Sequence, residues 1–330
     1  MRASSRGGSS VRGAVIAVLW ATVPAIAVLG MAGRPDVWGF HAPWDPRSAA
    51  SVAAHADQLA VVVSGWIALD STSGAPAMRY PDTLRLRGHA RRFALVTTYA
   101  RDRFHPELIR QLGSDAAARE RVAGAIATLA VAGDYRGLIL DFEGQTPADT
   151  AALAAVVRAV ADSAHRHRIA PVTVAVPPAE SIAYAPRVLR AADLLLVMLY
   201  DQHWATSPPG PIASPEWVAS LLGTWVERAG ASRIVAGLPA YGYAWAPGAN
   251  ASVVSFGDVA ALARRTGLPL VRDTIAQMLH VTRADSVDIW VSDAPLLATL
   301  VAEVERTGVR HIALWRLGLE DPAIWQAAIR

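Results

Sequence analysis

The chain has 330 residues, of which 53% are hydrophobic and 18% charged, so it can bury a sizeable core and general disorder is excluded. It contains no cysteine, which excludes disulfides and thiol catalysis. Its formal net charge is +3, and its 31 basic residues are all arginines scattered along the chain, so we expect no nucleic-acid partner.

Residues 1–33 have the pattern of an export signal. Arg2, Arg6 and Arg12 precede residues 13–33, a segment without any charged side chain. The apolar segment is close to the roughly 20 residues that span a bilayer. We therefore expect either a cleaved signal peptide or a retained membrane anchor, and a protein that is secreted, periplasmic or anchored to the outer face of the cytoplasmic membrane.

From residue 34 to residue 330, short apolar runs alternate with amphipathic stretches, a pattern typical of repeated βα units. Eight strands with helices between them predict an α/β protein of the (β/α)8 TIM barrel type, with an open doubly wound sheet as the alternative. No glycine-rich fingerprint follows the first strand, which argues against a dinucleotide-binding version. The strands are expected at 37–41, 59–69, 93–99, 137–142, 171–176, 194–200, 234–239 and 311–315, and the helices at 48–55, 116–132, 147–165, 215–229 and 294–307, with helical turns near 184–191 and 322–328.

The interval between residues 239 and 294 is longer than a βα loop requires. It contains a helix-like run at 256–265 and two β-rich pieces at 278–282 and 287–291. We expect a small α+β insertion over about 245–292, after the seventh strand, that walls one side of a cleft. The alternative is an excursion that has no part in a site.

Two carboxylates follow the fourth predicted strand. The apolar run 138–140 leads directly to Asp141 and Glu143, which are two residues apart and so point the same way from a strand. The carboxyl ends of strands carry the catalytic groups of α/β barrels. Crowded like charges raise the pKa of one acid, which lets a carboxyl act as a general acid. From this segment alone, a catalytic pair and a plain acidic loop both remain open.

Four other predicted strands end in polar and aromatic residues. Aromatic rings pack on the C–H faces of sugars while polar groups bind the hydroxyls, although ordinary barrel packing could place some of these residues. No spacing typical of a metal site is present, so we expect neither a metal nor a cofactor. The residues are His41 and Trp44 after the first strand, Tyr200, Asp201 and Trp204 after the sixth, Tyr241 and Tyr243 after the seventh, and Trp315 on the eighth.

These motifs resemble glycoside hydrolase family 18, the chitinase-like (β/α)8 family, over about residues 36–328. The fourth-strand signature of that family is D-x-x-D-x-D-x-E. Asp141 and Glu143 match its last two acids, whereas Arg136 and Ile139 stand at the positions of the first two.

Three further signatures of the family are present in order. The sequence M-x-Y-D is intact at 198–201, G-L-P-x-Y-G is intact at 237–242, and Trp315 fits the tryptophan of the eighth strand. A closer similarity is to the family 18 domains of bacterial proteins that also carry polysaccharide deacetylase or glycosyltransferase modules, including spore-wall-type hydrolases. Segments 39–45, 208–214 and 313–318 carry that similarity.

The resemblance implies retaining, substrate-assisted hydrolysis of a β-linked polysaccharide that contains N-acetylhexosamine, either chitin-like or peptidoglycan-like. It implies Glu143 as the general acid and base and Asp141 as the group that orients the acetamido substituent. Tyr200 would bind the acetamido oxygen, with Asp201 in support. The substrate-binding candidates are Trp315 as the floor of the sugar site, with Trp44, Tyr241, Tyr243, Trp204 and His41 around it.

Ile139 replaces an acid that pairs with the counterpart of Asp141 in chitinases. We therefore expect Asp141 to be held by another partner and to remain ionised near Glu143. The loss also keeps open a non-catalytic, lectin-like glycan-binding protein of the same fold, although such relatives commonly lose the glutamate that is retained here. A transglycosylase is a further alternative. A polysaccharide or oligosaccharide is the expected partner, and no protein partner is predicted.

Overall fold

The computed structural model describes Met1 and residues 34–329, apart from residues 87, 180, 182–183 and 284–286. The export signal or anchor expected at 1–33 lies outside these described residues, except for Met1. In the described part, no helix combines the length and the apolar character needed to cross a membrane.

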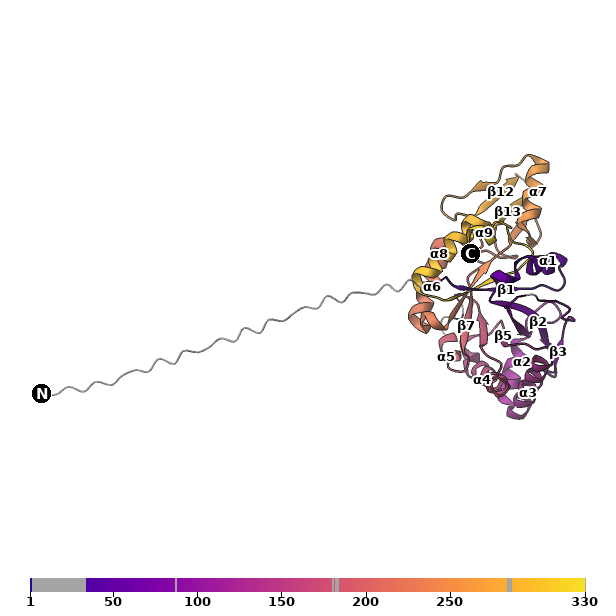
Figure 1. Cartoon of the computed structure of the whole chain (residues 1–330), viewed down its shortest axis with the longest axis vertical. Helices are drawn as coiled ribbons and strands as arrows, with labels where there is room; N and C mark the ends of the chain where they lie inside the picture. Colours follow the sequence, from indigo (N-terminus) through magenta and orange to yellow (C-terminus); the bar gives the residue numbers. More distant parts are fainter. Residues whose placement is uncertain (2–33, 87, 180, 182–183, 284–286, 330) are drawn as a thin grey trace. The chain divides into compact units, whose positions relative to one another are not determined.

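A closed barrel of parallel strands forms the centre of the described chain (Figure 1). Each barrel strand pairs in parallel with its neighbours, and β1 pairs with both β14 and β2, which closes the ring. The predicted (β/α)8 barrel is confirmed, and the doubly wound alternative is wrong because no open edge separates β1 from β2. The eight strands are β1 (Asp36–Phe40), β2 (Val61–Leu69), β4 (Arg91–Thr97), β5 (Gly137–Asp141), β6 (Val172–Val176), β7 (Leu194–Met198), β8 (Ile234–Pro239) and β14 (His311–Trp315).

Helices surround the strands, and their positions follow the expected amphipathic stretches with two differences. The expected helix at 147–165 is a 3-10 turn, η2 (Pro147–Asp149), followed by α4 (Thr150–Arg166). The sequence analysis missed α2 (Pro106–Ser114), although Pro106 at its first turn is a helix-start signal. The others are α1 (Pro46–His55), α3 (Ala116–Ala132), α5 (Ala185–Val188), α6 (Pro215–Ala229), α8 (Ala294–Thr307) and α9 (Ile324–Ala327).

Strand alternation separates two apolar layers. On β5, Leu138 and Leu140 pack outward in the larger cluster, which includes helix residues, whereas Ile139 packs in the cluster inside the barrel with Trp38 and Leu95. Because side chains alternate along a strand, Asp141 points to the same, inward side of the barrel as Ile139. The fold therefore directs Asp141 toward the barrel axis at the carboxyl end of β5.

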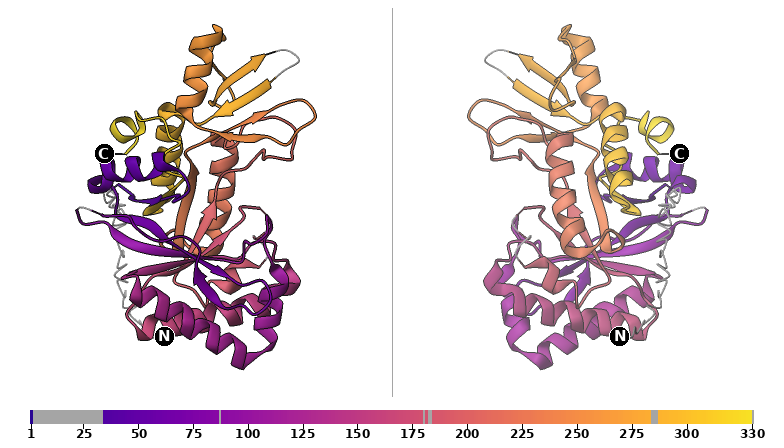
Figure 2. Two further views of the ribbon diagram at one scale, coloured as in Figure 1. Left: turned by 90° about the vertical axis from the view of Figure 1, so that its right-hand side faces the viewer. Right: turned by 90° about the vertical axis from the view of Figure 1, so that its left-hand side faces the viewer.

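The expected insertion is a second, antiparallel sheet with one helix, α7 (Phe256–Thr266), and its own small core. Figures 1 and 2 show it on the opposite side of the barrel from α3 and α4. It begins at Gly242, three residues before the expected start, because its first strand follows β8 almost directly; a Cβ at Gly242 would lie 2.4 Å from the Trp290 carbonyl oxygen. Its strands are β9 (Gly242–Trp245), β10 (Ser252–Val254), β11 (Val271–Arg272), β12 (Leu279–Arg283) and β13 (Val287–Val291), while β3 (Pro76–Met78) extends the barrel sheet beside β2.

Candidate active site

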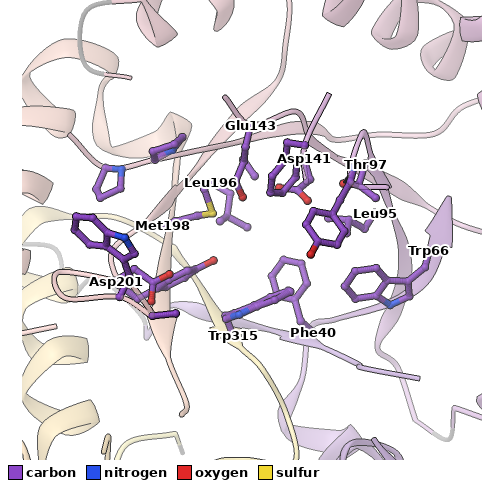
Figure 3. A pocket seen from close by; sticks show the side chains of 18 of the residues that line it. Phe40, Trp66, Leu95, Thr97, Asp141, Glu143, Leu196, Met198, Asp201 and Trp315 are labelled. Carbon is purple, nitrogen blue, oxygen red and sulfur yellow. Dashed lines mark hydrogen bonds between the residues drawn. The ribbon is translucent and has the colours of Figure 1, made fainter. Parts of the chain in front are cut away.

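A cavity of about 850 Å³ lies at the carboxyl ends of the barrel strands (Figure 3). Residues from β1, β2, β4, β5, β6, β7 and β14 and from the loops that follow them contribute to its wall. The predicted site residues that line it are Trp44, Asp141, Glu143, Tyr200, Asp201, Trp204, Tyr243 and Trp315, whereas His41 and Tyr241 lie outside the lining.

Asp141 and Glu143 face the cavity together from the end of β5 (Figure 3). Asp141 hydrogen-bonds to Glu143 and accepts a hydrogen bond from Thr97, its register partner on β4. Burial raises the pKa of Asp141 to about 6, and these two hydrogen bonds oppose the rise. The cause is therefore burial rather than the crowding of like charges that the sequence suggested.

Ile139 explains why Asp141 is poorly solvated. Its side chain is fully buried, in register with Leu95 on β4 and Thr173 on β6. The position below Asp141 is thus occupied by apolar core. Thr97 is the partner that holds Asp141. A pKa of about 6 leaves Asp141 mostly ionised at neutral pH, as expected from the sequence, and increasingly protonated as the pH falls below 6.

Asp201 is held by two tyrosines at the end of β7. Its φ of +60° lies in the left-handed region, where residues other than glycine are uncommon. The Tyr241 hydroxyl donates to Asp201 Oδ1, and the Tyr243 hydroxyl also bonds to this carboxyl. Burial raises the pKa of Asp201, so its charge is costly at this position. Tyr241 consequently supports the site from behind the cavity wall.

Tyr200, Tyr241 and Tyr243 remain protonated donors. Burial raises the pKa of Tyr200 well above its usual value, and the neighbouring charge of Asp201 adds to the rise. The same two causes act on Tyr241 and Tyr243. Tyr200 therefore presents an O–H group to the cavity in which Asp141 and Glu143 lie.

Aromatic rings form much of the cavity wall. Trp315 lies across the cavity from Asp141 and Glu143 (Figure 3), with its ring centre 5.2 Å from that of Phe40. Trp44 and Trp204 are exposed over 46% and 50% of their surfaces, which leaves ring faces available to a ligand. The sequence analysis missed Phe40, Trp66, Tyr80, Tyr99, Phe104 and Trp217 in the lining.

Trp66 was missed because β2 is irregular. A register shift between Val63 and Gly65 interrupts the alternation, so Val61, Val63 and Trp66 all pack inside the barrel. Strict period-two counting places Trp66 on the opposite face from Val61 and Val63. The glycine in the run was the available signal for the bulge.

His41 has a supporting position. It is buried, its Nδ1 lies 3.2 Å from Ser48 Oγ, and its carbonyl oxygen accepts a 2.9 Å hydrogen bond from Trp66 Nε1. Burial lowers the pKa of this imidazole, which favours its neutral form. His41 therefore supports the aromatic wall through Trp66, and a direct contact of His41 with substrate stays a prediction. Within the residues that the structure describes, no group of three or more His, Asp or Glu side chains is placed to hold a metal ion.

A charged network supports the loops that carry Trp44 and Trp315. Buried Asp45 accepts 3.0 Å hydrogen bonds from Arg47 and Arg316, and Arg47 continues to Asp258 on α7 at 2.9 Å. The bond from Arg47 is the largest cause that lowers the pKa of Asp45, to about 2. The Arg316 guanidinium lies 5.6 Å from the centre of the Trp44 ring. The network thus joins the first and last barrel loops to the insertion.

Comparison with known proteins finds a matching family and several relatives. The model of the glycosyl hydrolases family 18 matches residues 37–292. The uncharacterized glycosylase YvbX of Bacillus subtilis (strain 168) is 24% identical over 241 residues, which cover 68% of this chain and 69% of that protein. The cortical fragment-lytic enzyme of Bacillus subtilis (strain 168) is 24% identical over 249 residues, 70% of this chain but 58% of that enzyme, so this chain spans less than two thirds of its length.

Solved structures share the fold. The spore cortex-lytic enzyme SleL of Bacillus cereus superposes with a TM-score of 0.77 at 19% identity, over 88% of this chain and 73% of that chain. A class V chitinase from Pseudomonas fluorescens Pf-5 superposes with a TM-score of 0.76 at 23% identity, over 89% of this chain and 98% of that chain.

Proposed function

We propose that this chain, which belongs to the glycosyl hydrolases family 18, cleaves β-linked polysaccharides that contain N-acetylhexosamine by retaining, substrate-assisted hydrolysis. The observation that carries the proposal is the convergence of Glu143, Asp141, Tyr200 and Trp315 on one cavity. These side chains supply an acid, an acetamido-binding carboxyl, a hydroxyl donor and a ring on which a sugar stacks.

Glu143 acts as the acid and then as the base. In the first step its proton moves to the glycosidic oxygen while the acetamido oxygen of the same sugar attacks the anomeric carbon, which expels the leaving chain and forms an oxazolinium ion. In the second step the Glu143 carboxylate takes a proton from water, and the water oxygen attacks the anomeric carbon and opens the oxazolinium ring. Two inversions at that carbon retain its configuration.

Asp141 and Tyr200 bind the reacting acetamido group. The Asp141 carboxylate accepts a hydrogen bond from the acetamido N–H group and stabilises the positive charge that develops on the oxazolinium ring. The protonated Tyr200 hydroxyl donates to the acetamido oxygen and so directs it toward the anomeric carbon. Both side chains are poorly solvated, which strengthens their interaction with charge compared with the same contact in water.

The substrate class follows from this mechanism, because only a sugar with a 2-acetamido group supplies the internal nucleophile. The named relatives include both cortex-lytic enzymes and chitinases, which supports either a peptidoglycan-like or a chitin-like chain as substrate. The basic and apolar pattern of residues 1–33 supports export to a compartment where such glycans lie.

Product analysis tests the proposal. The full chain is incubated with chitin oligomers, peptidoglycan strands and a fully deacetylated glucosamine polymer, and products are identified by mass spectrometry. We expect cleavage of at least one acetamido substrate and none of the deacetylated polymer. Comparable cleavage of the deacetylated polymer would rule out substrate assistance, and binding without any cleavage would favour a lectin-like function.

A further inference from the structure

We propose that Arg79 binds a carboxylate on the glycan, so that the cavity prefers acetamido polysaccharides that carry an acidic substituent. This inference rests on the proposed glycosidase function and narrows its substrate. It assigns a specificity role to a residue in the loop after β3.

Arg79 lies exposed at the cavity wall, where three contacts position its guanidinium group. Its Nη1 donates a 2.8 Å hydrogen bond to the carbonyl oxygen of Tyr99, which follows β4. Its guanidinium carbon lies 5.8 Å from the centre of the Tyr80 ring and 5.7 Å from that of the Tyr99 ring. Contacts to two rings and one carbonyl restrict the guanidinium group, which lowers the conformational entropy that binding a ligand must remove.

The charge of Arg79 is not balanced by a carboxylate of the chain. Within the described residues, Arg79 forms no ion pair, whereas the cavity-lining loops hold Arg316 against Asp45 and the barrel holds Arg92 against Asp82. A guanidinium group has five N–H donors, and the Tyr99 carbonyl accepts from one nitrogen. Donors therefore remain for a ligand, and their fork geometry suits a carboxylate.

The cavity is electrostatically divided. Arg79 is the one basic side chain in its described lining, which also contains the three acids Asp141, Glu143 and Asp201. Asp141 and Glu143 lie between the Trp66 side of the cavity and the Asp201 side (Figure 3). A ligand carboxylate near these acids is repelled, whereas one at Arg79 is attracted.

An aromatic wall connects Arg79 to the sugar-binding region. The Trp44 ring centre lies 4.9 Å from that of Trp66 and 5.4 Å from that of Tyr80, and Tyr80 in turn contacts Arg79. A glycan that stacks along these rings places a substituent within reach of the guanidinium group. The lactyl ether of muramic acid and the carboxyl of a hexuronic acid both have the required chemistry, and neutral chitin has neither.

The test compares kcat/KM for matched substrates in the full chain. The substrates are chitin oligomers, peptide-free peptidoglycan strands, the same strands with their lactyl carboxyls methyl-esterified, and a polymer that alternates hexuronate with acetamido sugar. Each is assayed with the wild-type chain, Arg79→Gln, Arg79→Lys and the control Arg121→Gln. Arg121 is exposed on α3, so Arg121→Gln changes the net charge by the same amount as Arg79→Gln but outside the cavity lining.

We expect the wild-type chain to have a higher kcat/KM on the acidic strands than on their methyl esters. Arg79→Gln should reduce the ratio of these two kcat/KM values about five- to tenfold, because one partly exposed charge-assisted contact is lost. Arg79→Lys should retain part of the preference, and Arg121→Gln all of it. A preference for the hexuronate polymer over the lactyl strands would identify the hexuronate as the source of the carboxylate.

Two results separate the inference from the function on which it rests. If the wild-type chain cleaves acidic strands and their esters equally, or if Arg79→Gln leaves the ratio unchanged, the role of Arg79 is wrong while the glycosidase function stands. If no acetamido substrate is cleaved, the Glu143→Gln and wild-type chains are compared for binding to the acidic strands, and equal binding to strands and esters overturns the inference independently of catalysis.

Discussion

Asp141 is a carboxyl whose ionisation depends on a balance between burial and two hydrogen bonds. Burial above the apolar Ile139 raises its pKa to about 6, and the Thr97 hydroxyl favours its ionised form. Because the proposed role of Asp141 requires a carboxylate, kcat/KM should fall as the pH is lowered through about 6.

Thr97→Val tests this balance. Removal of the hydroxyl destabilises the ionised form, so the pKa of Asp141 rises and the acidic limb of the kcat/KM profile moves to higher pH. Thr98→Val is the matched control, because the Thr98 hydroxyl is buried and has no hydrogen-bond partner in the described chain. An acidic limb at the same pH in Thr97→Val and wild type would show that Thr97 does not set the ionisation of Asp141.

Ile139→Asp should destabilise the barrel. The new carboxyl would lie among Trp38, Leu95 and other apolar side chains inside the barrel, so we expect the free energy of unfolding to fall by about 3 kcal/mol or more. Ile139→Val, which removes one methyl group, should cost only about 1 kcal/mol. Urea unfolding at pH 7 measures both, and equal stability of Ile139→Asp and wild type would mean that the barrel interior accommodates an acid at this position.

Residue-level prediction succeeded where strand periodicity applies. The two-residue spacing of Asp141 and Glu143 and the apolar run before them predicted that both acids point the same way from the end of a strand, and both line the cavity. Arg79 and Phe104 lie in loops, which have no repeat that relates sequence position to direction. Such residues reach the cavity through tertiary contacts that the sequence does not display.

Among the elements, the network of Arg47, Asp45 and Arg316 joins α1, the β14 loop and the insertion. Hydrogen bonds from the arginines lower the pKa of Asp45 to about 2 in the folded chain, compared with 3.8 ordinarily. A depressed pKa stabilises the folded state above the unfolded pKa, and this stability is lost as the pH falls from about 4 toward 2.

Asp45→Asn should lower the free energy of unfolding by about 2 kcal/mol at pH 7, and the difference from wild type should shrink as the pH is lowered toward 3. Asparagine still caps α1, so the change isolates the charge. Asp258→Asn is the control, because its side chain is 64% exposed and its ion pair should contribute at most about 1 kcal/mol. Urea unfolding at both pH values measures these differences, and a pH-independent loss in Asp45→Asn would contradict the electrostatic explanation.

The strands and most helices were predictable because they have strong periodicity or clear start signals. The bulge in β2 and the short strands β3, β10 and β11 were not, because two or three residues cannot display a repeat. The start of the insertion was misplaced for a different reason. β9 continues almost directly from β8, so no loop separates the barrel strand from the first strand of the insertion. The chain changes from one sheet to the other at Gly242, whose backbone lies close to that of Trp290.

At the scale of the whole described chain, the closed barrel brings residues far apart in sequence to one rim. Trp44, Asp141, Asp201 and Trp315 meet because the carboxyl ends of all parallel strands lie on the same side. The insertion adds Tyr243 from β9, which lines the cavity and bonds to Asp201. The barrel thus supplies the acids of the proposed mechanism, and the insertion completes one wall of the cavity.

The central claim is that Glu143 transfers the proton in glycoside cleavage, and Glu143→Gln tests it most directly. Hydrolysis of the preferred acetamido glycan and its binding by calorimetry are measured for this variant, the wild-type chain and Glu216→Gln, an exposed change on α6. We expect Glu143→Gln to reduce kcat by about a thousandfold or more with Kd within about threefold of wild type, and Glu216→Gln to match wild type in both. Equal kcat in Glu143→Gln and wild type would contradict the account.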